Sequence, residues 1–167
     1  QRMRRPYASK DLLGSVQRLR AVDPLFTLTT DVIVGFPGET EQDLQATLDV
    51  IRRVAFAKVH VFPYSPRPFT PAAREERQVP AKVAKKRLHS VLEAAEQTGM
   101  VFARQFVGRD VTIVSEKSSP GEVEGYSEHY FWTEGRTEGN ETPERDRFVV
   151  VHVEGCHFDG DRVVLTG

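Results

Sequence analysis

Cysteine is almost absent from this sequence, since Cys156 is the only one among 167 residues. A single thiol excludes an internal disulfide framework and fits a reducing compartment. Long apolar runs are also missing, because none approaches the roughly 20 residues that span a bilayer. The first residues, Gln1 to Pro6, lead into no apolar segment of a signal peptide. We therefore expect a cytoplasmic protein with no membrane partner.

Several motifs of common enzymes are missing as well. The chain contains no G-x-x-x-x-G-K phosphate loop and no G-x-S-x-G nucleophile elbow. His152, Cys156 and His157 lie close together, but three potential ligands without a second cluster do not make a four-ligand zinc site, so we expect no metal there. Position 1 is not methionine, which suits a piece of a longer protein. The residues alone do not reveal a reaction.

Charge is distributed unevenly along the chain, although the net charge is only −1. Residues 1–109 carry 18 Lys and Arg against 11 Asp and Glu, a charge of +7. Residues 110–167 carry 5 against 13, a charge of −8. This shift predicts two units with different surfaces, of which the basic first one is compatible with a polyanionic partner.

The most informative stretch is Thr29-Thr30-Asp31-Val32-Ile33-Val34-Gly35-Phe36-Pro37-Gly38-Glu39-Thr40. Its β-branched run, residues 32–34, is typical of a strand covered on both faces. Pro37-Gly38 is turn chemistry, and Thr40 is a candidate N-cap for a helix over residues 41–54. Because the intervening loop follows the carboxyl end of a strand, it lies where α/β proteins bind ligands.

Alternation along this strand puts Asp31 and Ile33 on the face opposite Val32 and Val34. In a barrel the valine face would meet the surrounding helices, so Asp31 would point into the lumen. Two interpretations stay open at this point. Asp31 is either a ligand-binding carboxylate or a buried aspartate satisfied by backbone amides or a neighbouring Thr hydroxyl.

A second strand over residues 58–62 follows the helix and predicts a right-handed, parallel βαβ unit. His60 in this strand is more often packed and hydrogen-bonded than a ligand or an acid–base group. The proline-rich segment 63–71 predicts a stiff, exposed loop at the same end of the sheet as Gly35. Arg67 lies between two prolines there and could face a phosphate, although a solvated arginine is commoner.

Two further helices are predicted, over residues 9–22 with Ser9 as N-cap and over about 80–107. Basic residues crowd the first half of the longer helix, which is more often a solvated face than a nucleic-acid contact. Beyond Gly108 the pattern is all-β. Strand-like segments cover residues 110–115, 123–132, 148–153 and 162–165, with a turn at 118–121, a hairpin turn in 157–161 and a loop over 135–146. These short strands predict a small β-barrel.

Two segments of the chain are distinctive. They are residues 29–40 and Lys58-Val59-His60-Val61-Phe62-Pro63-Tyr64-Ser65-Pro66-Arg67, which Thr70-Pro71-Ala72-Ala73 follows. Together they resemble the radical S-adenosylmethionine methylthiotransferases. The second segment is most similar to the branch that modifies N6-threonylcarbamoyladenosine beside the tRNA anticodon. Sibling branches act on isopentenyladenosine in tRNA or on a ribosomal-protein aspartate, and they usually have a different sequence in the segment that corresponds to residues 58–67. Arg4-Arg5-Pro6-Tyr7, the Lys-Lys-Arg of the long helix and Gly125-Tyr126-Ser127-Glu128 also match, so the resemblance covers essentially the whole chain.

The resemblance implies a fold that is α/β followed by all-β. Residues 1–107 would be the closing part of a radical-SAM (βα) barrel, and residues 108–167 a TRAM-like barrel that presents RNA. By the family's pattern Asp31 would hold the ribose or amino group of S-adenosylmethionine. Ile33 and Gly35 would line its pocket, and the backbone near Phe62 and Pro63 would meet the adenine edge. The implied tRNA contacts are Arg67, Lys82, Lys85, Lys86, Arg87, Tyr126, Tyr130 and Trp132.

The family holds two 4Fe-4S clusters, one through a Cys-x-x-x-Cys-x-x-Cys loop and one through an N-terminal domain, and neither ligand set is present here. The resemblance therefore implies the last third of a larger enzyme, without catalytic residues of its own and inactive alone. Phe69 stands where the family usually has Gly, and the TRAM-like part is acidic. Open strand edges predict a poorly soluble piece. The alternatives are a non-catalytic RNA-binding module, a sibling methylthiotransferase, and a radical enzyme of another branch.

Overall fold

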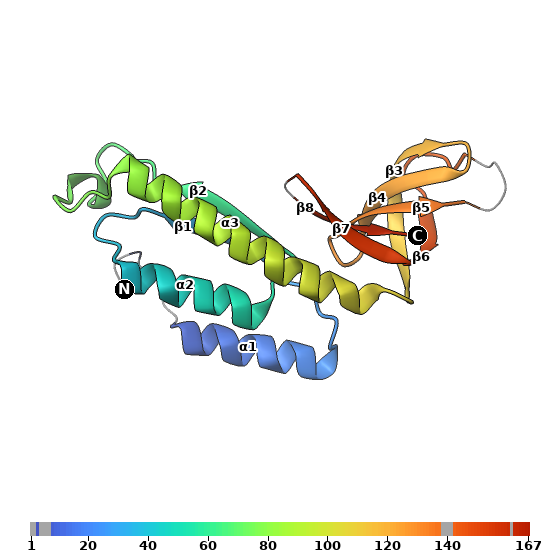
Figure 1. Ribbon diagram of the computed structural model, residues 1–167, viewed down its shortest axis with the longest axis horizontal. Helices are drawn as coiled ribbons and strands as arrows, with labels where there is room; N and C mark the ends of the chain where they lie inside the picture. The colour runs from blue at the N-terminus through green and yellow to red at the C-terminus, as the bar shows by residue number, and fades with distance from the viewer. Residues whose placement is uncertain (1–2, 4–7, 138–141, 161) are drawn as a thin grey trace. The chain divides into compact units, whose positions relative to one another are not determined.

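The computed structural model describes residues 3, 8–137, 142–160 and 162–167. These residues divide into two compact units, the first from residues 1–55 and 59–95 and the second from residues 56–58 and 96–167. The elements in chain order (Figure 1) are α1 (Ser9–Val22), β1 (Thr29–Val34), α2 (Glu41–Val54), β2 (Lys58–Pro63), η1 (Ala72–Arg74), α3 (Ala81–Ala103), η2 (Arg104–Phe106), β3 (Asp110–Ser119), β4 (Glu122–Ser127), β5 (Trp132–Arg136), β6 (Phe148–His152), β7 (Gly155–Asp159) and β8 (Arg162–Thr166).

In each of the first two helices an aspartate of the first turn accepts the N–H of the N-cap residue. The Ala8 N–H donates to the Asp11 carboxylate at 2.8 Å, so α1 is capped one residue before the predicted Ser9. At α2 the Thr40 hydroxyl accepts the Asp43 N–H at 3.2 Å, and the Asp43 carboxylate accepts the Thr40 N–H at 2.8 Å. This reciprocal pair is a capping box. The predicted Thr40 cap is confirmed.

The C-terminal end of α2 is held by an arginine from α1. Arg20 donates from Nη1 to the Val54 carbonyl at 2.5 Å and from Nη2 to the Ala55 carbonyl at 3.2 Å. These bonds satisfy carbonyl groups that a helix end leaves unpaired. Burial lowers the pKa of Arg20 from its ordinary value. The two helices lie side by side (Figure 1).

β1 and β2 form a two-stranded sheet. Tyr64, just after β2, donates its N–H to the carbonyl of Val34 at the end of β1, at 2.8 Å. Because the carboxyl ends of the paired strands meet, the pair is parallel, as the βαβ pattern predicts. Val34 and Val59 are buried, and the first half of α3 crosses one face of this pair (Figure 1).

The opposite face of this sheet is open among the described residues. Ile33 is 40% exposed and Phe62 is 51% exposed, and Asp31 and His60 are exposed as well. The prediction that β1 is covered on both faces is therefore wrong for this chain. The prediction of a packed His60 is also wrong, since no described element covers that face.

The second unit contains a six-stranded sheet in the order β6-β3-β4-β5-β8-β7, antiparallel except for the parallel pair β5–β8. Its core includes three phenylalanines, with ring centroids 5.7 Å apart for Phe102–Phe106 and 5.5 Å apart for Phe106–Phe131. Ile113 and Leu165 are fully buried in the same unit. The predicted all-β texture after Gly108 is confirmed.

The six-stranded sheet curls strongly without closing. A Cβ placed on Gly135 of β5 would lie 2.5 Å from Val151 Cγ2 of β6, although two strands separate β5 from β6 in the sheet. No ladder joins β6 to β7 among the residues that the structure describes, so the expected closed barrel is not formed there.

Several element boundaries differ from the predicted ones. β3 runs to Ser119, through the first half of the predicted turn 118–121, and β7 occupies residues 155–159, where only a hairpin turn was predicted. The predicted strand 123–132 is broken, because Ser127 donates its N–H to the Phe131 carbonyl and accepts the Tyr130 N–H, both at 2.9 Å, which forms a turn between β4 and β5. The long helix ends at Ala103 and continues as the short η2. The predicted loop 135–146 lies partly outside the described residues.

No helix in the described part of the chain is long and apolar enough to cross a membrane.

Candidate functional site

The loop after β1 is the centre of the candidate site. Gly35 and Gly38 have positive φ angles of 74° and 73°, which side-chain-bearing residues rarely adopt. The Gly38 N–H donates to the Arg77 carbonyl at 2.7 Å, and the Glu39 N–H donates to the Phe36 carbonyl at 2.8 Å. The predicted Pro37-Gly38 turn is therefore confirmed, and hydrogen bonds fix the backbone of the loop.

A buried ion pair fastens this loop to α3. Arg87 Nη1 lies 2.7 Å from Glu39 Oε2, and the two side chains are only 9% and 11% exposed. The same Glu39 oxygen accepts the Gly35 N–H at 2.6 Å. Sequence reasoning missed this pair because 48 residues separate its members. The only available signal was a glutamate directly after the Gly-Phe-Pro-Gly loop.

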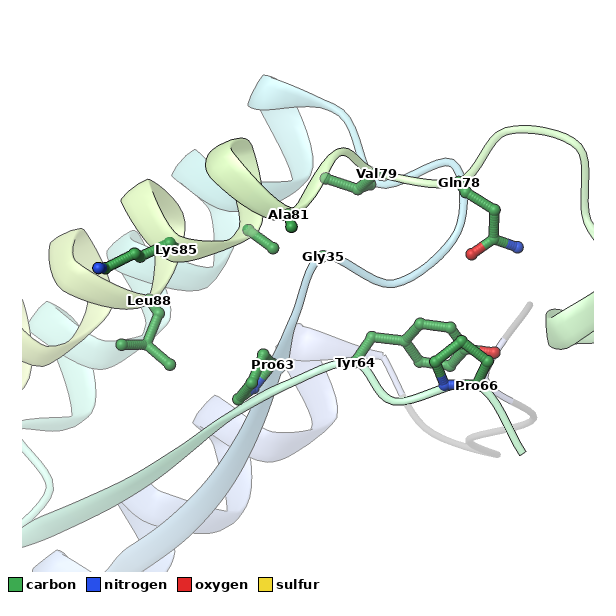
Figure 2. A pocket seen from close by; sticks show the side chains of 10 residues that line it. Gly35, Pro63, Tyr64, Pro66, Gln78, Val79, Ala81, Lys85 and Leu88 are labelled. Atoms are coloured by element: carbon green, nitrogen blue, oxygen red, sulfur yellow. The ribbon is translucent and has the colours of Figure 1, made fainter.

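A cavity of about 310 Å³ lies beside Gly35 (Figure 2). Its walls come from the carboxyl ends of β1 and β2, from the segment before α3, and from the first turns of that helix. The lining residues are Gly35, Pro63, Tyr64, Pro66, Gln78, Val79, Ala81, Ala84, Lys85 and Leu88. The Tyr64 hydroxyl is buried without a hydrogen-bond partner among the described residues. The cavity is therefore mainly apolar, with an unused hydroxyl in one of its lining residues.

The predicted cofactor residues fall into two places in the first unit. Gly35 and Pro63 line the cavity. Asp31, Ile33 and Phe62 lie on the open face of the β1–β2 sheet. A carboxylate flanked by exposed apolar side chains combines a hydrogen-bond acceptor with a surface for an aromatic ring. This combination suits a ligand whose hydroxyl or amino groups can donate to the carboxylate while an aromatic ring lies on the apolar side chains.

The proline-rich loop after β2 is exposed, as predicted. Arg67 is exposed in it, and the Arg67 carbonyl accepts the Thr70 hydroxyl at 2.8 Å. Phe69 has a φ of 66° and is 91% exposed. Positive φ favours glycine, so a glycine at this position, which the resemblance leads us to expect, would have a conformational reason.

The basic run at the start of α3 divides into two kinds of residue. Lys82, Lys85 and Lys86 are exposed and available to a polyanion. Arg87 is buried against Glu39 instead. The expectation that Arg87 contacts RNA is corrected accordingly, because its guanidinium is already engaged inside the first unit.

Aromatic side chains line a groove on the six-stranded sheet, with a volume of about 520 Å³. Tyr126 and Tyr130 contribute to it, as does Phe148, which is 81% exposed. Phe148 and Tyr126 both lie directly opposite Val114, so the three side chains form a row across β6, β3 and β4. Phe148 was missed because Phe148–His152 is too uniformly apolar to indicate which face is exposed.

Trp132 differs from the other predicted aromatic contacts, since only 4% of it is exposed. Arg162 Cζ lies 4.4 Å from the centroid of its ring, and Tyr126 packs edge-on at 5.2 Å. Arg162 lies over the indole ring, and the buried ring leaves little surface on which a base could stack. The expectation that Trp132 stacks on RNA is therefore corrected.

Potential metal ligands are scattered in this structure. His152 Nδ1 lies 2.7 Å from the Asp110 carboxylate. Burial raises the pKa of the Cys156 thiol, and the positive charge of Arg104 partly offsets this rise. Within the described part of the chain, no three His, Cys, Asp or Glu side chains gather as a metal-binding group. One cysteine in the sequence does not fit a 4Fe-4S cluster, which is held by several thiolates.

Comparison with curated proteins identifies the relatives of this chain. Threonylcarbamoyladenosine tRNA methylthiotransferase MtaB of Thermotoga maritima is 42% identical over 130 residues, which are 77% of this chain and 30% of that protein. The tRNA-2-methylthio-N(6)-dimethylallyladenosine synthase of Mycobacterium tuberculosis is 46% identical over 112 residues, 67% of this chain and 21% of that protein. This chain is a homologue of the tRNA methylthiotransferases.

A third relative, the tRNA-2-methylthio-N(6)-dimethylallyladenosine synthase of Corynebacterium glutamicum, is 44% identical over 67% of this chain and 22% of its own length. The chain thus spans less than a third of the methylthiotransferases that it matches. No protein-family model matches it. The family resemblance predicted from residues 29–40 and 58–67 is confirmed by these identities.

Proposed function

We propose that this chain is the C-terminal portion of a cytoplasmic radical S-adenosylmethionine methylthiotransferase. The intact enzyme would add a methylthio group at C2 of N6-threonylcarbamoyladenosine beside the tRNA anticodon. The observation that carries the proposal is the open face of the β1–β2 sheet, where Asp31 and Ile33 lie beside the Gly35 loop. The division into a barrel part, residues 1–107, and a TRAM-like part, residues 108–167, stays a prediction.

The residues present fit S-adenosylmethionine, which would supply the radical and the methyl group. Asp31 would accept hydrogen bonds from its ribose or amino group, and Ile33 and Phe62 would offer apolar surface to its adenine. Gly35 and Pro63 would bring backbone close to the ligand. The iron–sulfur clusters are different, because this chain has no ligand set for them, and we derive no step through them.

The proposed tRNA contacts come from both units. In the first, Arg67, Lys82, Lys85 and Lys86 are exposed cations that can neutralise phosphates. In the second, the groove with Tyr126 and Tyr130 offers exposed rings on which unpaired bases stack. Glu116 and Glu128 line the same groove, so stacking would outweigh phosphate attraction there.

Replacing Asp31 tests the cofactor assignment. In the intact protein, Asp31→Ala should weaken S-adenosylmethionine binding about tenfold or more, since a hydrogen bond to a charged group is lost. Because the Asp31 side chain is exposed within this chain and packs into no core, the melting temperature should hardly change. Asp49→Asn, which removes an exposed carboxylate of α2, is the matched control. Equal affinity of the Asp31→Ala protein and the wild type would reduce Asp31 to a structural residue.

A non-catalytic RNA-binding module is the second candidate, and the exposed cations of α3 with the aromatic groove favour it. Both candidates predict that this chain alone is inactive, so activity of the isolated chain does not separate them. The presence of a Cys-x-x-x-Cys-x-x-Cys motif in the preceding part of the protein would support the enzyme. Assays with tRNA carrying threonylcarbamoyladenosine or isopentenyladenosine, and with the ribosomal-protein aspartate, would distinguish the sibling activities.

A further inference from the structure

We propose that Glu39 and Arg87 are positioning residues for S-adenosylmethionine, although neither would touch it. Arg87 of α3 orients the Glu39 carboxylate, and Glu39 fixes the Gly35 amide at the end of β1. The affinity for S-adenosylmethionine would then depend on the Glu39–Arg87 ion pair, which lies inside the first unit. The inference rests on the proposed function, because it assumes that the cofactor binds beside Gly35.

Three hydrogen bonds carry the argument. Glu39 Oε2 accepts the Gly35 N–H at 2.6 Å and Arg87 Nη1 at 2.7 Å. Arg87 Nη1 also donates to the Glu39 carbonyl at 3.0 Å. The Glu39 carboxylate therefore closes the loop through the Gly35 N–H. Glu39 is also bound to α3 twice, through its carboxylate and through its backbone carbonyl.

Packing reinforces this connection between the helix and the loop. A Cβ on Gly35 would lie 2.8 Å from the Ala84 Cβ, so the loop backbone contacts α3 directly. Ala84 precedes Arg87 by three residues, which places both on one side of the helix. Leu88 of the same helix lines the cavity beside Gly35. A shift of α3 would consequently move both the loop and the cavity wall.

Stability alone does not explain the pair. Taking two charges out of water is costly, and apolar residues of similar volume are often as stable or more stable in their place. Arg87 Nε is in addition buried without an acceptor among the described residues, which adds a desolvation cost. An interaction with little net benefit to stability is expected where it imposes a geometry, here that of the Gly35 amide.

The experiment replaces the pair by apolar residues in the intact protein. The Glu39→Met/Arg87→Met variant should melt within about 3 °C of the wild type or above it. Its Gly35 amide should exchange with solvent at least about tenfold faster, because the N–H has lost its acceptor. The dissociation constant for S-adenosylmethionine, from equilibrium dialysis without reductant, should rise about tenfold.

Two further variants sharpen the outcome. Asp49→Asn/Arg52→Met removes an exposed ion pair of α2, N–O 3.4 Å, and should change none of the three readouts. Glu39→Gln keeps an oxygen for the Gly35 N–H and should retain more affinity than Glu39→Met. A Glu39→Gln protein that binds no better than Glu39→Met would overturn the positioning role of the carboxylate oxygen.

The remaining results separate the inference from the proposed function. A wild type that binds S-adenosylmethionine and a Met/Met variant that binds it equally well would overturn the positioning role alone. A Met/Met variant that melts far below the wild type would assign the pair to folding and also overturn it. A wild-type protein that does not bind S-adenosylmethionine would overturn the proposed function and this inference together.

Discussion

Phe69 occupies a backbone conformation that suits glycine. The left-handed region costs a residue with a side chain about 1–2 kcal/mol, whereas glycine loses about 0.5–1 kcal/mol of chain entropy on folding. With 91% of Phe69 exposed, its ring contributes little packing within this chain. We therefore expect Phe69→Gly to raise the free energy of unfolding by about 0.5–1 kcal/mol.

Urea denaturation of the intact protein measures this effect. Phe69→Ala is the matched control, because it removes the ring but keeps a Cβ at positive φ, and it should give no comparable gain. A Phe69→Gly protein that is less stable than the wild type would indicate that the ring packs against a part of the protein outside this chain.

At the scale of single elements, the β3–β4 pairing depends on Gly125. A Cβ there would run into the Val114 carbonyl of the neighbouring strand. Gly125→Ala should therefore lower the free energy of unfolding by about 1–3 kcal/mol, because the strands must separate locally. Gly155→Ala, whose Cβ would lie 3.1 Å from Thr166 Oγ1, should cost less than about 1 kcal/mol.

Chemical denaturation of both glycine variants, followed by circular dichroism, makes the comparison. Equal stability of Gly125→Ala and Gly155→Ala would contradict the close approach of β3 and β4 at this point.

Elements with local signals were predictable from the sequence. Thr40 and Asp43 cap α2 within four residues, and Pro37-Gly38 turns the chain without help from distant residues. Burial was harder to predict. Arg87 belongs to a lysine-rich run, yet a glutamate 48 residues earlier draws it inside. Trp132 is a good stacking residue by type, but the six-stranded sheet places Arg162 over its ring.

At the scale of the whole chain, the open face of the β1–β2 sheet should cause association. Ile33 and Phe62 expose apolar surface there, and the two-stranded sheet has no further strands at its edges within the described residues. We expect the isolated chain to associate with rising concentration in sedimentation velocity. Ile33→Thr/Phe62→Thr should reduce this association.

Phe148→Thr provides the control, because it removes a still more exposed ring from the other unit. It should leave the association nearly unchanged. A monomeric chain with one cooperative melt would contradict the prediction, and association that only Phe148→Thr abolishes would assign it to the groove instead.

The three residues Phe56–Lys58 precede α3 by more than twenty positions, yet they belong to the second unit. Phe56 and Ala57 are buried, and the carbonyls of both lie 3.6 Å from where a Cβ of Gly99 would be. A single cut that separates the second unit from the first would therefore leave part of the core of the second unit, Phe56–Lys58, on the wrong side of the cut. Swapping this unit between related enzymes requires two junctions, one on each side of Phe56–Lys58, in addition to the one inside the long helix.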